Sequence, residues 1–152
     1  MSKIKLDIDS EQNILNMLLD SSSLTSEQMS KINTTSPEIG KTKLETAIEL
    51  NFTDEKKIQK TLSTNYSLEL ISLEKKVIDP KIRKIIDLRY LQDNLLVPFE
   101  MTGGILKIAI ADASKLGLMK NLKTITKMEP ELYAATISDI NDFIDRMSRQ
   151  ET

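Results

Sequence analysis

The chain has 152 residues, a formal net charge of −2, and no cysteine, histidine or tryptophan. This length suits one domain or two small ones, and the missing residue types exclude disulfides, zinc-thiolate sites and every catalytic mechanism that uses a thiolate or an imidazole. The near-neutral charge argues against nucleic acid as a partner. No apolar stretch approaches the ~20 residues that cross a bilayer. We therefore predict a cytoplasmic protein.

The first half of the chain reads as a series of helices. The first is predicted by an apolar face that ends before the serine run 21–23 and comprises Ile14, Leu15, Leu18 and Leu19. Thr25 and Gln28 form a capping-box signature, which predicts a second helix through Met29 and Ile32. We expect the polar segment 33–37 to be a loop, because its side chains compete with helical hydrogen bonds.

Two further helices are predicted in this half. One carries Leu44 and Ala47 and ends near Asn51, and the next starts at residues 53–55 and carries Ile58 and Leu62. Segments 24–27 and 52–55 share a pattern, in which an apolar residue precedes a Thr cap and an acidic first turn. The pattern fits a duplicated helix-turn-helix unit, but any capped helix can also show it.

The second half alternates strands and helices. Strands are predicted at 68–71, 95–101, 106–110 and 131–136, with Pro98 marking an edge or a bulge and Gly103-Gly104 a hairpin turn. A helix follows Asp79-Pro80, another is capped by Asp112, and Ser138-Asp139 caps the last. The predicted fold is α+β: a helical subdomain (1–65), then a strand-helix-strand-strand-helix-strand-helix subdomain (66–152) with an antiparallel hairpin, packed as one module.

Candidate sites in the sequence are weak. Gly40-Lys41-Thr42 resembles the end of a phosphate-binding loop, but Thr35 stands where that loop needs a glycine and no strand leads into it. The carboxylates of Asp139, Asp142 and Asp145 fit a solvated helix face better than a cation site. The basic residues of segment 75–84 suit an acidic partner, a phosphate group or plain solvent. We predict no catalytic and no metal-binding residue.

From Ala47 to Arg149 the chain resembles the N-terminal domain of bacterial type II secretion and type IV pilus assembly ATPases. The resemblance rests on pieces in the family's order: Phe52-Thr53-Asp54-Glu55, Tyr66-Ser67-Leu68, Ile78-Asp79-Pro80, Leu95-Leu96-Val97-Pro98, Gly103 through Asp112, and Ser138-Asp139-Ile140. Ala113 departs from it, since the family usually has Pro there.

Some members of this family bind cyclic di-GMP through two tandem motifs built on Arg, Gly and Gln. Asn13 stands where the first motif has Arg, Ser22 where it has its second Gly, and Asn51 and Asn65 replace Gly and Gln in the second. The positions that the resemblance assigns to this ligand are Asn13, Leu18, Ser22, Asn51, Ile58, Leu62 and Asn65. Without Arg and Gly the ligand loses its phosphate clamp, while the apolar scaffold remains.

The resemblance implies a non-catalytic docking and regulatory domain without a cofactor. Its partners would be the cytoplasmic domain of an inner-membrane platform protein and the ATPase core of its own parent chain, which would make it peripheral to the inner membrane through those partners. A cyclic di-GMP receptor with a divergent motif is the alternative. An ATP-handling enzyme that uses Lys41 is a third hypothesis, which the sequence supports little.

Overall fold

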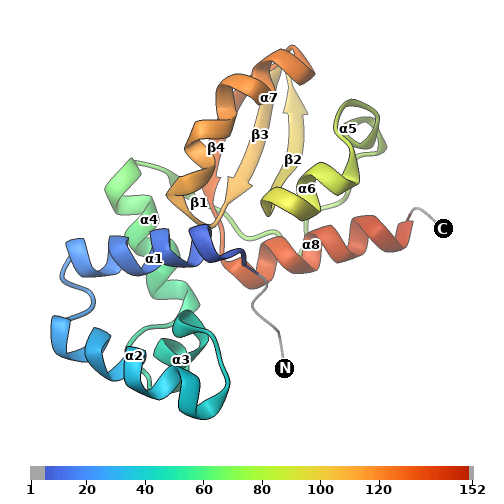
Figure 1. Ribbon diagram of the computed structural model, residues 1–152. Helices are drawn as coiled ribbons and strands as arrows, with labels where there is room; N and C mark the ends of the chain where they lie inside the picture. Colours follow the sequence, from blue (N-terminus) through green and yellow to red (C-terminus); the bar gives the residue numbers. More distant parts are fainter. Residues whose placement is uncertain (1–5, 151–152) are drawn as a thin grey trace.

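A computed structural model describes residues 6–150 of the chain (Figure 1). The helical half comprises α1 (Ile8–Asp20), α2 (Ser26–Ile39), α3 (Lys43–Glu49) and α4 (Glu55–Tyr66). Each begins at a side chain that accepts a hydrogen bond from a backbone N–H of the first turn, and these caps are Asp7, Thr25, Thr42 and Asp54. Four local caps therefore set where the chain turns in this half.

The predicted loop at 33–37 is wrong, because α2 runs through it with Pro37 inside the helix. Pro37 lies near the end of α2, so the hydrogen bond that it cannot donate is lost close to the terminus. The Thr34 hydroxyl donates to the carbonyl of Ser30 within the helix (3.1 Å) and does not compete with it. Gly40, with a φ of 68°, then ends the helix in the left-handed conformation that glycine adopts without strain.

The second half holds a four-stranded sheet of β1 (Glu69–Leu70), β2 (Leu96–Thr102), β3 (Ile105–Ile110) and β4 (Glu129–Ala134). The strand order is β1-β4-β3-β2, with β2 and β3 antiparallel and the other two pairs parallel. Gly103 and Gly104 make the hairpin turn at φ values of 54° and 82°. Pro98 lies on the edge strand β2, where the register shifts between Pro98 and Glu100. The predicted α+β class, hairpin and edge-strand proline are confirmed.

The helices of this half are α5 (Pro80–Ile85), α6 (Leu88–Asn94), the 3₁₀ helix η1 (Ala113–Leu118), α7 (Met119–Thr126) and α8 (Ile137–Gln150). The single helix predicted after Pro80 is two helices, because Ile86 is extended and Asp87 precedes a new one. Asp112 caps η1, whose final residue leads directly into α7. The predicted cap at Ser138 is wrong: α8 starts at Ile137, and Thr136 Oγ1 accepts a hydrogen bond from Asp139 N–H (3.1 Å).

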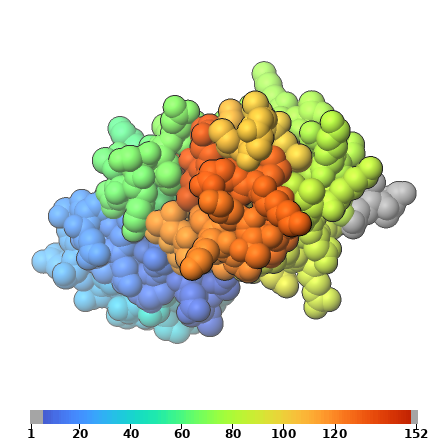
Figure 2. Space-filling view, turned by 90° about the horizontal axis from the view of Figure 1, so that it is seen from above, coloured from blue at the N-terminus to red at the C-terminus, as the bar shows by residue number. Residues whose placement is uncertain are grey.

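One hydrophobic core runs through both halves and includes Leu18, Leu62, Ile108 and Phe143. Figure 2 shows α7 (orange) in the centre, with α4 (green) and the N-terminal helices (blue) on one side and the α5–α6 region (lime) on the other. The sheet buries Ile108 on one face, while Lys107 and its ion-pair partner Glu100 (3.1 Å) lie on the other. Within residues 6–150, no helix is long and apolar enough to cross a membrane.

Candidate functional site

Two turns in the helical half have the same backbone geometry. Ser22 and Asn51 hold left-handed φ values of 61° and 62°, a conformation that costs residues other than glycine roughly 1 kcal/mol or more. Ser22 N–H donates to the carbonyl of Leu19 (3.1 Å), and Asn51 N–H donates to that of Ile48 (3.0 Å). The two turns thus reverse the chain in the same way after α1 and after α3.

The same interval separates the helix caps that follow the turns. Ser22 and Asn51 are 29 positions apart (51 − 22), as are the cap residues Thr25 and Asp54 (54 − 25). The predicted Thr cap of α4 is therefore wrong: Thr53 is buried at 4% exposure, and Asp54 Oδ1 accepts from Lys57 N–H (2.8 Å). The sequence pattern paired Thr25 with Thr53, whereas the cap residue equivalent to Thr25 in the structure is Asp54, one residue later.

The first of these turns borders a groove against α4, which we call the Ser22 groove. It has a volume of about 460 Å³ and is lined by Ser21, Ser22, Ser23, Lys57, Lys60, Thr61, Thr64 and Asn65. Two ammonium groups, hydroxyls and an amide converge there, and no carboxylate belongs to the lining. The Ser22 groove therefore offers cations and hydrogen-bond donors that suit an anionic ligand.

Of the seven positions assigned to the ligand, Ser22 and Asn65 line the Ser22 groove. Leu18, Ile58 and Leu62 come together in the hydrophobic core at 2% exposure or less and do not line the groove. Asn51 lies exposed at the second turn and does not line the groove. Asn13 lies elsewhere, with Oδ1 accepting a hydrogen bond from Ala113 N–H (3.2 Å).

Sequence reasoning missed Lys57 and Lys60. They share one face of α4 with Thr61 and Thr64, because residues three and four apart are neighbours on a helix surface. That spacing was readable from the sequence as a polar stripe opposite Ile58 and Leu62. Nothing in the sequence indicated that the serine turn after α1 lies beside this stripe.

Asn13 belongs to a polar junction between α1 and η1. Asn13 bonds to Ala113. At the same junction, Nζ of the buried Lys115 lies 3.6 Å from Asp7 Oδ2. Burial raises the pKa of Asp7, but hydrogen bonds from Ser10 and the charge of Lys115 lower it, and the net pKa lies below its ordinary value of 3.8. The junction fixes the first helix against the α+β half.

The loop at Gly40-Lys41-Thr42 is a helix-to-helix connection. Gly40 ends α2, Thr42 caps α3, and Lys41 Nζ forms an ion pair with Glu49 Oε2 (3.0 Å). Each residue therefore has a structural role in this turn. The geometry is that of two consecutive helix ends, and no strand precedes it as in a phosphate-binding loop.

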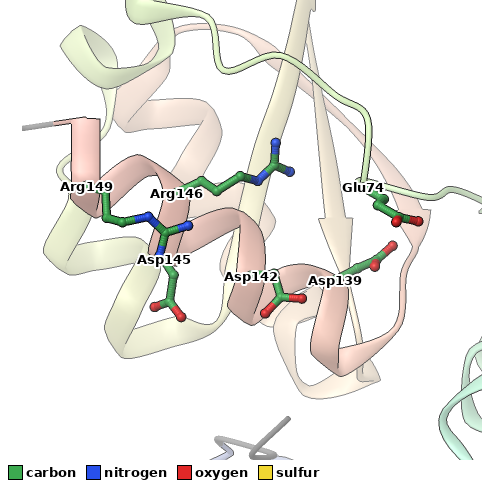
Figure 3. Close-up of a pocket in the computed structure, with 6 residues that line it drawn as sticks. All are labelled: Glu74, Asp139, Asp142, Asp145, Arg146 and Arg149. Carbon is green, nitrogen blue, oxygen red and sulfur yellow. The ribbon is translucent and has the colours of Figure 1, made fainter. Parts of the chain in front are cut away.

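The three aspartates of α8 border a hollow of about 310 Å³ together with Glu74, Arg146 and Arg149 (Figure 3). Asp139 Oδ2 accepts a hydrogen bond from Leu73 N–H (2.9 Å), so this carboxylate holds a loop. Asp142 and Asp145 are exposed. Among residues 6–150, no group of three or more Asp or Glu side chains is arranged to hold a metal ion.

Comparison with known proteins identifies the family. The MshEN domain profile matches residues 66–152, more than half of the chain. Two solved structures share the fold at low sequence identity. MshE with cdg has 19% identity, a TM-score of 0.63, and coverage of 88% of this chain and 96% of that one. The XpsE N-terminal domain has 20% identity, a TM-score of 0.60 in one crystal form, and coverage of 93% and 98%.

The chain belongs to the MshEN domain family, the N-terminal domains of type II secretion and type IV pilus assembly ATPases. In these proteins the MshEN domain is a regulatory part, distinct from the catalytic ATPase core. No curated protein matches the sequence significantly. The resemblance proposed from the sequence is confirmed.

Proposed function

We propose that this domain is a non-catalytic docking and regulatory module that binds the cytoplasmic domain of an inner-membrane platform protein. The observation that carries the proposal is the family match over residues 66–152. Secretion and pilus ATPases work with such platform proteins, and we infer that the platform protein binds the ATPase through this N-terminal domain. Its other contact would be the ATPase core of its parent protein.

The internal bonding of the domain supports a role in transmission. Gln59 Nε2 on α4 donates to the carbonyls of Ile71 (3.2 Å) and Ala134 (2.8 Å), and Glu55 on α4 accepts from Ser138 on α8 (2.7 Å). These bonds join the helical half to the sheet half at two points. Under the proposed role, a displacement that a partner imposes on one half would reach the other through these contacts.

Calorimetric titration of the domain with the platform protein's cytoplasmic domain tests this proposal. The platform protein is taken from the secretion or pilus gene set of the same genome. We expect saturable binding with a micromolar or tighter Kd. Absence of heat and of co-elution with every platform component of that genome would contradict it.

We propose cyclic di-GMP binding as the second candidate function, on the strength of the Ser22 groove. The motif glycines are replaced, yet Ser22 and Asn51 keep the left-handed backbone that glycine favours. Lys57 and Lys60 supply positive charge beside Ser22 and Asn65, whereas Asn13, which replaces the arginine of the motif, lies outside this groove. A bound anion would here be held by ammonium groups as point charges, without the planar fork of an arginine.

Titration with cyclic di-GMP distinguishes this candidate from the first. We expect Lys57→Glu and Lys60→Glu to abolish any binding, because each reverses a charge at the Ser22 groove. Lys120→Glu is the matched control, since Lys120 is an exposed lysine on α7 outside that groove. A flat titration for the wild type, or equal weakening by Lys120→Glu, would count against the candidate.

A further inference from the structure

The loop between β1 and α5 presents an exposed apolar side chain. Val77 has 85% of its surface accessible, while Leu73 and Ile78 in the same loop are buried at 0% and 7%. The two buried side chains anchor the loop in the core. Val77 is thus held outward by its neighbours.

Arg146 on α8 fixes the backbone of this loop. Its Nη2 donates to the carbonyl of Leu73 (2.7 Å) and its Nη1 to that of Lys76 (3.0 Å). Leu73 N–H donates to Asp139 Oδ2 (2.9 Å), and Lys76 N–H donates to the Leu73 carbonyl (3.1 Å). Figure 3 shows the Arg146 side chain reaching from α8 toward the loop. A partner that binds here meets a preformed surface and loses little loop entropy.

Val77 lines two hollows. The first, of about 430 Å³, defines what we call the Val77 patch: Glu74, Lys75, Lys76, Val77, Ile78, Arg146 and Arg149. The second, of about 480 Å³, lies between residues 76–80 and residues 99–101 of β2. A partner segment that packs against Val77 can therefore occupy either hollow.

The Val77 patch is basic on a chain whose net charge is negative. Four cationic side chains, Lys75, Lys76, Arg146 and Arg149, face one carboxylate, Glu74. The hydrogen bonds of Arg146 go to carbonyls, which leave its charge in place. Lys76 Nζ lies 5.6 Å from the centre of the Phe99 ring, a contact that also keeps the charge.

Asp142 and Asp145 lie four residues before Arg146 and Arg149 on α8, so these carboxylates share a helix face with the two arginines. Asp142 and Asp145 line the neighbouring hollow and do not line the Val77 patch. In Figure 3 their carboxylates point away from the guanidinium of Arg146. Glu74 in the patch and Asp79 and Glu100 in the second hollow also lie near Val77, and Glu100 is ion-paired with Lys107 (3.1 Å). The basic side of Val77 is therefore the side of the first hollow.

We propose that the Val77 patch is a docking surface for an acidic protein segment in which carboxylates flank an apolar side chain. The apolar side chain packs against Val77, and the carboxylates pair with the surrounding lysines and arginines. The inference builds on the docking role proposed above, and adds the surface and the chemistry of the partner.

The test uses a synthetic peptide with a central leucine flanked by glutamates, labelled for fluorescence anisotropy and titrated with the full domain. We expect saturable binding that weakens at least tenfold in Val77→Asp and several-fold in Lys75→Glu, and that falls as salt is raised. The matched controls are Ile125→Asp and Lys120→Glu on α7, an exposed apolar residue and an exposed lysine outside the patch. Both should bind like the wild type.

Absence of peptide binding overturns the inference, and so does equal weakening by the control variants. A peptide with serine in place of leucine should bind at least fivefold more weakly, and equal binding would reduce the patch to nonspecific attraction. Vesicles of phosphatidylglycerol are the other probe. If Val77→Asp weakens binding to vesicles but not to the peptide, the surface serves a membrane and the inference is wrong.

Titration with the platform protein's cytoplasmic domain separates this inference from the proposed function. If the wild type and Val77→Asp bind that domain equally, the docking function stands and the surface named here is wrong. If the peptide binds at the patch and no platform domain binds at all, the patch stands and the proposed platform partner is wrong.

Discussion

The carboxylate of Glu55 accepts two hydrogen bonds from Ser138, a residue 83 positions away. Oε1 accepts from the backbone N–H and Oε2 from the hydroxyl, both at 2.7 Å. Glu55 is the first residue of α4, and Ser138 lies in the first turn of α8. A carboxylate from the helical half thus accepts a hydrogen bond from an N–H at a helix start in the sheet half, where negative charge is favoured.

Glu55→Ala should therefore destabilise the whole domain. We expect the free energy of unfolding to fall by about 1–3 kcal/mol, because the N–H and hydroxyl of Ser138 lose a charged acceptor. Urea unfolding followed by circular dichroism measures the change. Glu27→Ala is the control, since Glu27 occupies the first turn of α2 and is exposed, and it should cost only a few tenths of a kcal/mol. Equal effects would mean that the Glu55 bonds add nothing beyond helix electrostatics.

Asn13→Ala should loosen the contact between α1 and η1. The amide oxygen of Asn13 is the acceptor for Ala113 N–H, and its removal should cost about 1 kcal/mol and speed hydrogen exchange at that amide. Asn16→Ala, three residues further along α1, removes an exposed side chain that bonds only within its own helix in the contacts described. If exchange at Ala113 is the same in both variants, Asn13 does not hold the junction.

The local signals of the sequence predicted most of the fold. The capping box at Thr25, the Asp79-Pro80 helix start and the Gly103-Gly104 turn depend on a few neighbouring residues, and each appears where predicted. The errors arose where one local preference competed with another. The polar residues of 33–37 favour a loop, but the capping box at one end and Gly40 at the other enclose them in a helix.

The site was less predictable because it depends on contacts between distant segments. The Ser22 groove forms where the turn after α1 meets α4, and the Val77 loop is fixed by Arg146, some 70 residues later. The sequence also placed Asn13 in a ligand motif, whereas its side chain bonds to Ala113 across 100 positions. No periodicity or spacing within one segment reports such pairings. The boundary predicted near residue 65 stays a prediction.

The stability of the domain should fall at acidic pH partly through Asp7. Its pKa is lowered in the folded state, because the hydrogen bonds from Ser10 and the charge of Lys115 outweigh its burial. The unfolded state therefore binds a proton more readily, and the contribution of Asp7 is complete above its ordinary pKa of 3.8 and is lost as the pH falls through the lower folded value.

Asp7→Asn should accordingly flatten the acid limb of the stability curve, since asparagine caps a helix without titrating. Urea unfolding at a series of pH values between neutrality and about 3 measures the slope. Asp20→Asn serves as the control, because Asp20 is an exposed residue at the opposite end of α1. An unchanged slope in Asp7→Asn would contradict the assignment.

Ser22→Gly should stabilise the domain by about 0.5–1 kcal/mol. The φ of 61° strains a serine, and the relief outweighs the extra entropy that glycine brings to the unfolded chain. Asn51→Gly at 62° should gain less, because asparagine tolerates the left-handed region better. Thermal unfolding measures both. A lower Tm in Ser22→Gly would mean that the serine side chain makes a compensating contact at the turn.

Leu62→Ala separates the core role of the motif positions from a ligand-binding role. Leu62 is fully buried, so truncation should cost about 2–5 kcal/mol through lost contacts and a residual cavity. Leu62→Met keeps most of the volume and should cost less than about 1.5 kcal/mol. Urea unfolding gives both values, and calorimetry with cyclic di-GMP gives the affinity of the folded Met variant. If Leu62→Met leaves stability intact but lowers that affinity relative to the wild type, Leu62 contacts the ligand in addition to packing in the core.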